Sequence, residues 1–529
     1  MKFDIVIAGG GFAGAYCARE LGKSLGPVEG PKRVALIAER NVLIFHPMLA
    51  EVAGSTLGPL DVVNPLRHFC RHVTVFQGTV QHIDGAAREL IVDGGRFTRN
   101  QTVRCGKLVV ALGSITNLSQ IPGMAEHGWP MKNVADAIRF RAALINRLEE
   151  ANIASDPAVR TRLLTFVVVG GGYTGVETAG QLLGFLHRAL KWYPALQHRH
   201  LRVILLHAGD ELLPEIGPSL GAYARGVLEK RGVDVRLKAK VQSLTLSKVT
   251  YEGGTIDTHT VLTTIGNAPN PVVNEMAREL KLELAHGRLP VEPTMQVAGQ
   301  PELYAIGDCA AVPWNDRGTL KTSPPTAQFA LRQGRQLAQN LIRQRKGGAA
   351  RPFAYRYLGQ LATIGEHEAV AEVLGMHFRG FFAWWLWRTI YLAKLPGVLR
   401  RIRVMVDWTF DLIFNRDISV VLPPPDEVMR SIHLDAGEEL FAQGSIARGV
   451  FLVRRGGVRL EGGSTRRVGP GDIIDQDDTD DAGAWTVTAV AAEPSDLIVF
   501  RGRAYQLLKD ELKIVPRRAG RPARAGKAG

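Results

Sequence analysis

A glycine-rich turn that directly follows an apolar strand constrains the N-terminal part of this chain more than any other feature. The apolar run at residues 5–8 leads into Gly9-x-Gly11-x-x-Gly14 and then into an apolar helical pattern. The first glycine allows a tight bend, the second lets the backbone touch a pyrophosphate, and the third lets the helix pack on the strand. The next strand ends at Glu39, late because "GPVEGPK" is expected to lengthen the loop before it. A carboxylate there can accept hydrogen bonds from ribose hydroxyls, so a first dinucleotide site is predicted.

The same pattern recurs in "LLTFVVVGGGYTGVETAGQL", with Gly170-x-Gly172-x-x-Gly175 opening a second helix. Two such turns in one chain indicate two dinucleotides, most economically a bound flavin and a diffusing nicotinamide nucleotide. The strand "LVVALGS" and the later stretch "YAIGDCA" return to the first domain, where Asp308 is placed to bind a flavin ribityl chain. We therefore predict an α/β protein with two Rossmann-type dinucleotide-binding domains, the second inserted in the first.

The second glycine turn differs from the usual dinucleotide-binding pattern at the residue that binds the ribose. The strand "RVILLHAGDELLP" ends in His207, where users of NADH normally carry an acid. One interpretation is that the missing repulsion admits the 2′-phosphate of NADPH. The other is that His207 is a surface residue and that Asp210 or Glu211 binds the ribose.

Length, hydropathy and charge bound the remaining possibilities. The 529 residues indicate three or four structural units. The most apolar stretch, Phe381 to Val398, is interrupted by Arg388 and Lys394 and falls short of the roughly 18 apolar residues of a spanning helix. The chain starts in a strand with no basic region before it, so we expect no signal peptide and a cytoplasmic compartment. The net charge of +14 is compatible with nucleic acid, an anionic membrane surface or solubility alone.

The cysteines are few and far apart. They show no C-x-x-C pair and no histidine partner at metal spacing, so neither a disulfide framework, nor a cysteine-pair redox mechanism, nor a metal site is predicted. The four are Cys17, Cys70, Cys105 and Cys309.

With these motifs together, the chain from Met1 to about Val421 resembles the type II NADH dehydrogenases, single-subunit flavin NADH:quinone oxidoreductases. Further stretches carry the resemblance: "IFHPMLAEVAGSTL", "IPGMAEHGWPMKNVADAI", "YRYLGQLATIGEHEAV" and "GFFAWWLWRTIYL". Related disulfide reductases and sulfide:quinone oxidoreductases need cysteines near the flavin, and no such arrangement is visible. The resemblance implies that FAD stays bound, that NADH reduces it, and that quinone reoxidises it without proton pumping.

The resemblance also implies site residues. For FAD they are Gly9, Gly11, Phe12, Ala13, Gly14, Glu39, Arg40, Val80, Ala111, Gly113, Asp308, Ala327 and Gln328. For NADH or NADPH they are Gly170, Gly172, Tyr173, Gly175, Glu177, His207 and Gly266. Glu177 and Gln328 are the implied catalytic residues, with Glu177 handling a proton near the flavin and nicotinamide. A purely structural role for Glu177, at the start of a helix, is the alternative.

The stretch "TAQFALRQG" is similar to the quinone motif Ala-Gln-x-Ala-x-Gln of that family. Ala327, Gln328 and Ala330 match, and Arg332 stands at the second glutamine position. Free N–H groups at a helix start would stabilise an anionic reduced flavin, and Gln328 can hydrogen-bond a quinone oxygen. Arg332 either polarises the quinone or signals a changed acceptor, and Gln328 is alternatively a solvated helix residue.

Residues 376–422 combine aromatic and basic side chains around Pro396. The aromatic ones are Trp384, Trp385, Trp387, Tyr391 and Trp408, and the basic ones are Arg388, Lys394, Arg400, Arg401 and Arg403. This pattern is typical of an amphipathic segment that lies in a membrane interface, and alternatively of a core or dimerisation helix pair. We predict a peripheral protein on the cytoplasmic face of the cell membrane, a homodimer, with no nucleic acid partner.

After three prolines at 423–425, short alternating strands at residues 426–512 resemble the β-roll of cyclic-nucleotide-binding domains. The phosphate cassette of that family is not matched at Asp475, Gln476 and Gly483, and the acidic run "DQDDTDD" would repel a cyclic phosphate. Cyclic-nucleotide binding is therefore disfavoured. A degenerate regulatory or docking module and a divalent-cation loop are the alternatives, and the basic tail at residues 513–529 is predicted to be disordered.

The predicted domains are 1–125 and 293–375 for FAD, 126–292 for NAD(P)H, 376–422 for the membrane, 426–512 for the β-roll and 513–529 for the tail. The leading hypothesis is an NAD(P)H:quinone oxidoreductase. The alternatives are a flavin-based redox sensor that signals through the β-roll, and an NAD(P)H reductase of another acceptor.

Overall fold

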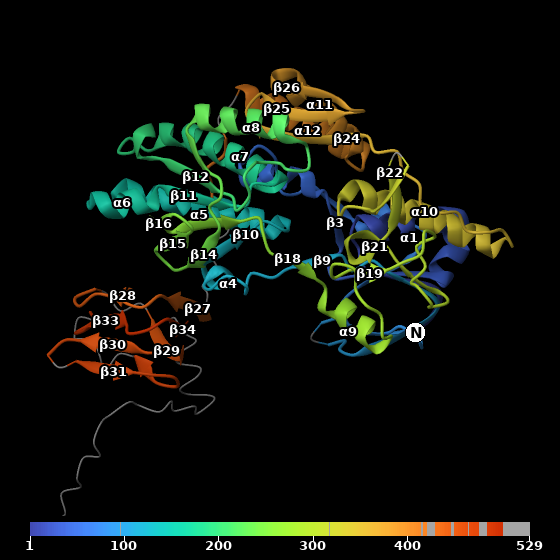
Figure 1. Cartoon of the computed structure of the whole chain (residues 1–529), viewed down its shortest axis with the longest axis horizontal. Coiled ribbons are helices and arrows are strands. Elements are labelled where there is room, and N and C mark those ends of the chain that lie inside the picture. The colour runs from blue at the N-terminus through green and yellow to red at the C-terminus, as the bar shows by residue number, and fades with distance from the viewer. Residues whose placement is uncertain are drawn as a thin grey trace, which may run out of the picture.

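The computed structural model describes residues 1–95, 97–316, 318–413, 416–420, 429–445, 449–463, 465–474 and 484–500. Figure 1 shows two α/β units next to each other, helices α11 and α12 above them, and a separate group of strands at one end. The predicted acidic run, the three-proline linker and the basic tail lie outside the described residues.

The first sheet carries the N-terminal glycine turn. Its parallel strands are, in order, β5 (Thr74–Gln77), β2 (Val34–Ala38), β1 (Lys2–Ala8), β8 (Gln101–Val110) and β20 (Leu303–Ala305). Strands β6 (Thr79–Asp84) and β7 (Glu89–Asp93) extend it in antiparallel fashion. Strand β20 joins this sheet from far along the chain, so the unit built on β11 is inserted in the first, as predicted. Strand β5 pairs with β2 in parallel, so the antiparallel pairs of this sheet involve only β6, β7 and β8.

The second sheet is wholly parallel, in the order β10 (Gly128–Pro130), β17 (Thr260–Thr263), β11 (Thr165–Val169), β12 (Arg202–Leu206) and β13 (Val233–Arg236). All residues of β11 and β17 are buried. Burial on both faces is the physical reason why β11 is almost entirely apolar and does not alternate. Beside this sheet lie α5 (Val134–Ile153), α7 (Tyr173–Ala189) and α8 (Pro218–Arg231).

The first helix is longer than predicted. Helix α1 spans Phe12–Arg33 and includes "GPVEGPK", which we expected to be a loop. Gly26 leaves the helical region with φ of 76°, and Pro27 and Pro31 follow within the helix. A proline restarts a helix readily at its first turn, so the break is a kink and not a loop. The loop prediction was wrong for this reason.

Helix α10 (Ala327–Arg345) lies along α1. A methyl group at Gly334 would overlap the carbonyl oxygen of Ala13, so this glycine allows the two backbones to approach closely. The antiparallel strands β24 (Gly359–Gly365), β25 (Glu368–Val373) and β26 (Met376–Arg379) follow. The segment predicted to be amphipathic from residue 376 therefore begins as a strand, because the turn at Gly375, with φ of 84°, returns the chain against β25.

Helices α11 (Gly380–Lys394) and α12 (Val398–Ile413) are separated at Pro396, as predicted. Each has a buried and an exposed apolar face: Trp387 is 1% exposed and Trp385 is 51% exposed. The buried face packs on the main core, and the exposed face includes Phe381, Phe382, Leu399, Ile402, Met405 and Val406. Within the described ranges, no helix has the length and hydropathy needed to cross a membrane.

The C-terminal unit is a β-roll of two antiparallel sheets with its own core. One sheet contains β27 (Met429–Leu434), β34 (Ser495–Phe500), β29 (Val450–Arg455) and β32 (Ile473–Ile474). The other contains β28 (Glu439–Phe441), β33 (Thr488–Ala491), β30 (Val458–Glu461) and β31 (Arg466–Val468). The predicted alternating strands are present within the described residues.

The β-roll contacts the second α/β unit through paired polar groups. Nε2 of His127, in α4 (Met124–His127), accepts a hydrogen bond of 2.9 Å from the backbone N–H of His433. The hydroxyls of Thr245 and Ser247 donate to Oε1 of Glu438 at 2.6 and 2.8 Å. These bonds attach the roll to the edge of the unit that carries the second glycine turn.

Candidate functional site

A long cleft lies at the carboxyl ends of the strands of the first sheet. The predicted FAD residues that line it are Gly9, Gly11, Phe12, Ala13, Glu39, Arg40, Val80, Ala111, Gly113, Asp308 and Ala327. They follow the ends of β1, β2, β8 and β20, lie at the start of β6, or belong to the first turns of α1 and α10. Residues more than 300 positions apart in the sequence therefore meet in one cleft, at the edge where open α/β sheets bind their ligands.

The geometry of the first turn explains its glycines. Gly9 has φ of 120°, and a methyl group at Gly14 would overlap the Gly9 carbonyl oxygen. Beside Gly11 there is open space within 4 Å, where a ligand can approach the backbone. Gly11 caps α1 without a side-chain hydrogen bond, so the helix start presents backbone N–H groups to the cleft. The residues present thus fit a pyrophosphate.

The cleft contains a lysine and a histidine that the sequence did not reveal. Lys132 Nζ donates to Ser114 Oγ at 3.2 Å and to Asn267 Oδ1 at 3.0 Å. Burial lowers the pKa of Lys132, and the Asp308 carboxylate opposes this. Burial also lowers the pKa of His46 to about 4, with the Lys132 charge adding to it, so this imidazole is neutral. Both residues lie in stretches that carry the family resemblance, but single positions without a spacing pattern give no signal of their own.

Asp308 lines the same cleft as the first glycine turn. Burial raises the pKa of its carboxyl, whereas the nearby cations Lys132 and Arg288 lower it. A partly buried carboxylate facing a lysine is a suitable acceptor for sugar-alcohol hydroxyls, the chemistry that a ribityl chain offers.

The second turn repeats the first. Gly170 has φ of 112°, a methyl group at Gly175 would overlap the Gly170 carbonyl oxygen, and the space beside Gly172 is open. Tyr173 begins α7, and within the described residues its buried hydroxyl has no hydrogen-bond partner. An unsatisfied buried hydroxyl beside a pyrophosphate turn fits a ligand with polar groups.

His207 is engaged by the turn itself. Its Nδ1 accepts a hydrogen bond of 3.1 Å from the backbone N–H of Gly171. Burial lowers the pKa of His207, which favours the neutral ring that this bond requires. Gly266 has φ of 92°, and its carbonyl accepts the N–H of Asn117 at 2.7 Å, next to the pairing of β9 (Ser114–Thr116) with β18 (Asn267–Pro269). Gly266 therefore lies where the two dinucleotide units join.

Glu177 is buried in α7, away from the cleft lining. Its Oε1 accepts a hydrogen bond of 3.2 Å from the N–H of Thr363 in β24. Burial raises the pKa of Glu177 to about 8, and the Glu51 carboxyl adds to the effect. Glu51, in α2 (Leu49–Ala53), is a second buried acid that sequence reasoning missed; burial raises its pKa to about 7, and Trp408 Nε1 donates to it at 3.2 Å. Both carboxyls are therefore able to hold a proton near neutral pH.

Gln328 and Arg332 point to one side of the cleft. The Gln328 amide donates to the Gly359 carbonyl at 2.9 Å and accepts from the Tyr355 hydroxyl at 2.9 Å. Arg332 donates to the Gln328 carbonyl at 2.9 Å, and its guanidinium lies 4.0 Å over the Tyr355 ring. The cleft lining contains Ala327 and Ala330 of this helix, whereas Gln328 and Arg332 face Tyr355.

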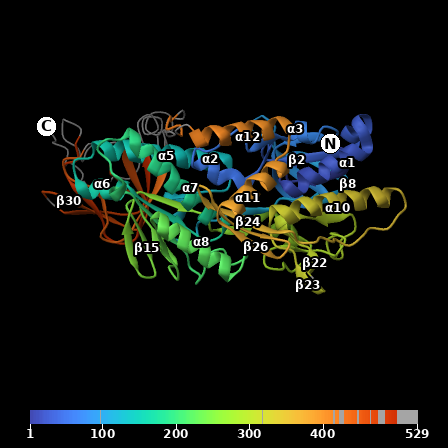
Figure 2. The same cartoon turned by 90° about the horizontal axis from the view of Figure 1, so that it is seen from above.

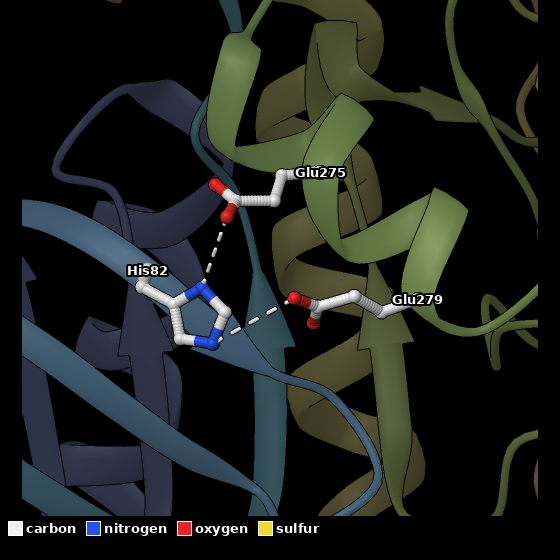
Figure 3. A group of neighbouring side chains, drawn as sticks. All are labelled: His82, Glu275 and Glu279. Carbon is white, nitrogen blue, oxygen red and sulfur yellow. Dashed lines mark ion pairs between the residues drawn. The ribbon is translucent and has the colours of Figure 1, made fainter.

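One group of side chains in the described part of the chain has the composition of a metal site. It consists of His82 in β6 with Glu275 and Glu279 in α9 (Pro271–Glu279). Figure 3 shows that the two carboxylates face opposite nitrogens of the ring, at 3.5 Å from Nδ1 and 4.0 Å from Nε2. The three candidate ligand atoms lie within 4.8 Å of one another on partly exposed side chains, and the same contacts are ion pairs when the ring is protonated.

Two dinucleotide turns, one of them in a cleft with Asp308 and the start of α10, define a flavin- and nicotinamide-dependent oxidoreductase fold. Comparison with known proteins narrows this class. Residues 3–334 match the pyridine nucleotide-disulphide oxidoreductase family, residues 357–417 the NDH2 C-terminal domain, and residues 431–510 the cyclic nucleotide-binding domain. The chain belongs to the type II NADH:quinone oxidoreductases of the pyridine nucleotide-disulphide oxidoreductase family.

Curated relatives cover most of the chain. The type II NADH:quinone oxidoreductase Ndh of Mycobacterium tuberculosis is 30% identical over 78% of this chain and 89% of its own. The internal alternative NAD(P)H-ubiquinone oxidoreductase A1 of Solanum tuberosum is 29% identical over 79% and 88%. Among solved structures, NDH2 from Plasmodium falciparum in complex with NADH has a TM-score of 0.73 at 18% identity, covering 79% of this chain and 100% of that one. The recognition from sequence motifs is confirmed.

Proposed function

We propose that this protein is an FAD-dependent NADH:quinone oxidoreductase that moves two electrons without pumping protons. The observation that carries the proposal is the pair of glycine turns, each with open space beside its middle glycine, joined at the pairing of β9 and β18. The names of the relatives support NADH and quinone as the substrates. We also retain the predicted domain boundaries as proposals.

The cleft residues would hold FAD. When bound, FAD accepts a hydride equivalent from the nicotinamide and makes the electrons available to a quinone. The turn at Gly9 and the start of α1 would bind the pyrophosphate, and Glu39 the ribose. Asp308 and Lys132 would orient the ribityl chain, and the uncapped start of α10 at Ala327 would direct N–H groups at the ring system.

The reaction consumes a proton from solution, because NADH, quinone and a proton become NAD⁺ and quinol. We propose that Glu177 holds that proton. Its carboxyl is buried, and the pKa of about 8 keeps it protonated at neutral pH. The Thr363 N–H fixes the orientation of Oε1.

We propose that Gln328 and Arg332 bind the quinone side. The Gln328 Nε2 donates one N–H to the Gly359 carbonyl, and its second N–H can donate to a quinone oxygen. Arg332 is stacked on Tyr355 and offers further N–H donors, which favours polarisation of the quinone over a changed acceptor.

We further propose peripheral attachment to the cytoplasmic face of the cell membrane through the exposed apolar face of α11 and α12. Nine exposed large hydrophobics in the described part of these helices and the basic residues between them support this interpretation, and the same face is where a second copy would pack in a homodimer. The exposed ones are Phe381, Phe382, Trp385, Val398, Leu399, Ile402, Met405, Val406 and Phe410.

For the nicotinamide nucleotide we propose NADH as the main donor. The His207 ring is used by the Gly171 N–H, which leaves Asp210 or Glu211 to bind the ribose hydroxyls. Use of NADPH is the minor alternative, since the residue at the strand end carries no negative charge.

A redox sensor is the second candidate, supported by the bonds from the second dinucleotide unit to the β-roll at His433 and Glu438. Stopped-flow mixing separates the two functions. We expect NADH to bleach the flavin rapidly and a soluble quinone analogue to restore its colour at the steady-state turnover rate. Stable bleaching with negligible reoxidation would favour the sensor and contradict the enzyme. Repeating the experiment with NADPH compares the rates at which the two nucleotides reduce the flavin.

A further inference from the structure

A shallow pocket on the outer face of α10 is distinct from the FAD cleft. Its polar lining consists of Arg332, Arg335 and Gln336, Gln339 of α10 and Arg356 of the loop that follows. Arginine offers only hydrogen-bond donors and glutamine offers an amide donor. Among the residues that the structure describes, no carboxylate lines this pocket. The pocket therefore has the composition of an anion site.

Two of the three arginines lie over aromatic rings. The Arg335 guanidinium lies 4.9 Å over the Tyr16 ring, and Arg332 lies 4.0 Å over the Tyr355 ring. None of the three arginines forms a salt bridge to a described residue. Stacking orients these two guanidiniums. Nη1 of Arg332 donates to the Gln328 carbonyl, and the other N–H groups of the two side chains suit bidentate binding of a phosphate.

More cations surround the pocket on the side of the apolar helices. Arg332 is close enough to Lys394, at the end of α11, for its charge to lower the pKa of that lysine. Arg19 and Arg401 both lie near Tyr16. Glu20, an acid near Tyr16, is paired with Lys23 at 3.1 Å. Helices α10, α11 and α12 are all in view on the face that Figure 2 shows. The positive pocket thus adjoins the exposed apolar face.

We propose that this pocket binds the phosphate headgroup of an anionic membrane lipid. The inference rests on the proposed attachment through α11 and α12, because a lipid headgroup reaches the pocket only when that face lies on a bilayer. Charge complementarity selects the occupant: a zwitterionic headgroup offers a phosphate with its own cation, whereas an anionic one leaves its charge for Arg335 and Arg356. The bound lipid would fix the orientation of the enzyme relative to the bilayer.

The test uses the full-length FAD-loaded protein and two sets of vesicles, phosphatidylcholine alone and equal parts of phosphatidylcholine and phosphatidylglycerol. The pocket variant carries Arg335→Gln and Arg356→Gln. A matched control carries Arg199→Gln and Arg202→Gln, which remove the same charge from exposed positions of the second unit. We expect the pocket variant to bind the mixed vesicles about tenfold or more weakly than wild type, with the control within about threefold.

Three results would overturn the proposal. Equal losses in the pocket variant and the control would show that only overall charge matters. Saturable binding of inorganic phosphate that the pocket variant abolishes, without a change in vesicle binding, would assign the pocket to a soluble phosphate. A change in oligomeric state of the variant by light scattering, with vesicle binding intact, would assign it to a second copy.

Reduction of a water-soluble quinone without vesicles separates this proposal from the proposed function. We expect the wild type, pocket variant and control to turn over at the same rate in that assay. If the wild type does not reduce the quinone, the proposed enzyme function is contradicted, whereas the result on lipid binding is unaffected.

Discussion

Glu177 is the residue whose chemistry depends most on its surroundings. Its pKa is raised by burial from 4.5 to about 8, so the fold favours the protonated form. The stability that this form contributes is fully present below about pH 4.5 and is lost as the pH rises through about 8. The Glu177→Gln variant should therefore gain stability relative to wild type as the pH is raised. Chemical unfolding at acidic and alkaline pH measures this difference.

The same substitution should slow quinone reduction. Loss of a positioned proton donor lowers a rate by roughly a hundredfold or more. We expect flavin reoxidation by quinone to slow by that order and to lose its fall above about pH 8, while reduction by NADH changes little. The Glu149→Gln variant, at an exposed carboxyl, is the control. A wild-type pH profile in the Glu177→Gln variant would exclude the proton role.

Site residues could be predicted from the sequence where they belong to a motif with fixed spacing. Gly9 and Gly170 belong to patterns that demand glycine for local steric reasons, and both have positive φ. Lys132, His46 and Glu51 stand alone in the sequence and acquire their environments only when distant segments meet. The orientation of Gln328 was equally invisible, because it depends on Tyr355 and Gly359.

The strand, turn and helix unit at the second site gives a prediction at the scale of an element. In Gly175→Ala a methyl group would overlap the Gly170 carbonyl oxygen and push α7 away from β11. We expect the KM for NADH to rise by about tenfold or more, a loss of roughly 1.4 kcal/mol, while FAD remains bound. The matched control is Gly226→Ala in α8, where the space is open. It should stabilise the helix by about 1 kcal/mol. Steady-state kinetics measures the KM for NADH, and flavin absorbance measures how much FAD stays bound. An unchanged KM in Gly175→Ala would contradict the steric argument.

Elements were predictable as far as they are local. Both glycine turns and the break between α11 and α12 follow from short patterns. The length of α1 was mispredicted because Pro27 and Pro31, which usually end helices, restart one after the kink at Gly26. Which aromatic residues of α11 are buried was undecided, since its pattern suits a membrane interface and a core equally. Packing buries Trp387 and leaves Trp385 exposed.

At the scale of the whole molecule, the β-roll and the flavoprotein units have separate hydrophobic cores. Separate cores joined by polar contacts unfold as separate cooperative units. We expect calorimetry to show a β-roll transition that excess FAD leaves in place. The flavoprotein transition should move to a higher temperature, because FAD at a hundredfold excess over its Kd stabilises the folded unit by about 2.7 kcal/mol. A single transition that shifts as one with FAD would show that the polar contacts couple the units, as a sensor requires.

The sequence by itself determined the two dinucleotide units, their nesting, the helical pair after them and the β-roll, because each is specified by periodicity and by glycine sterics within a short stretch. The family followed from those same motifs. Only the tertiary structure decided which lone residues share an environment: Lys132 with Asp308, Glu51 with Glu177, and Arg335 with Arg356. Burial and charge at these places are properties of the packed chain, since each depends on segments that approach one another only after folding.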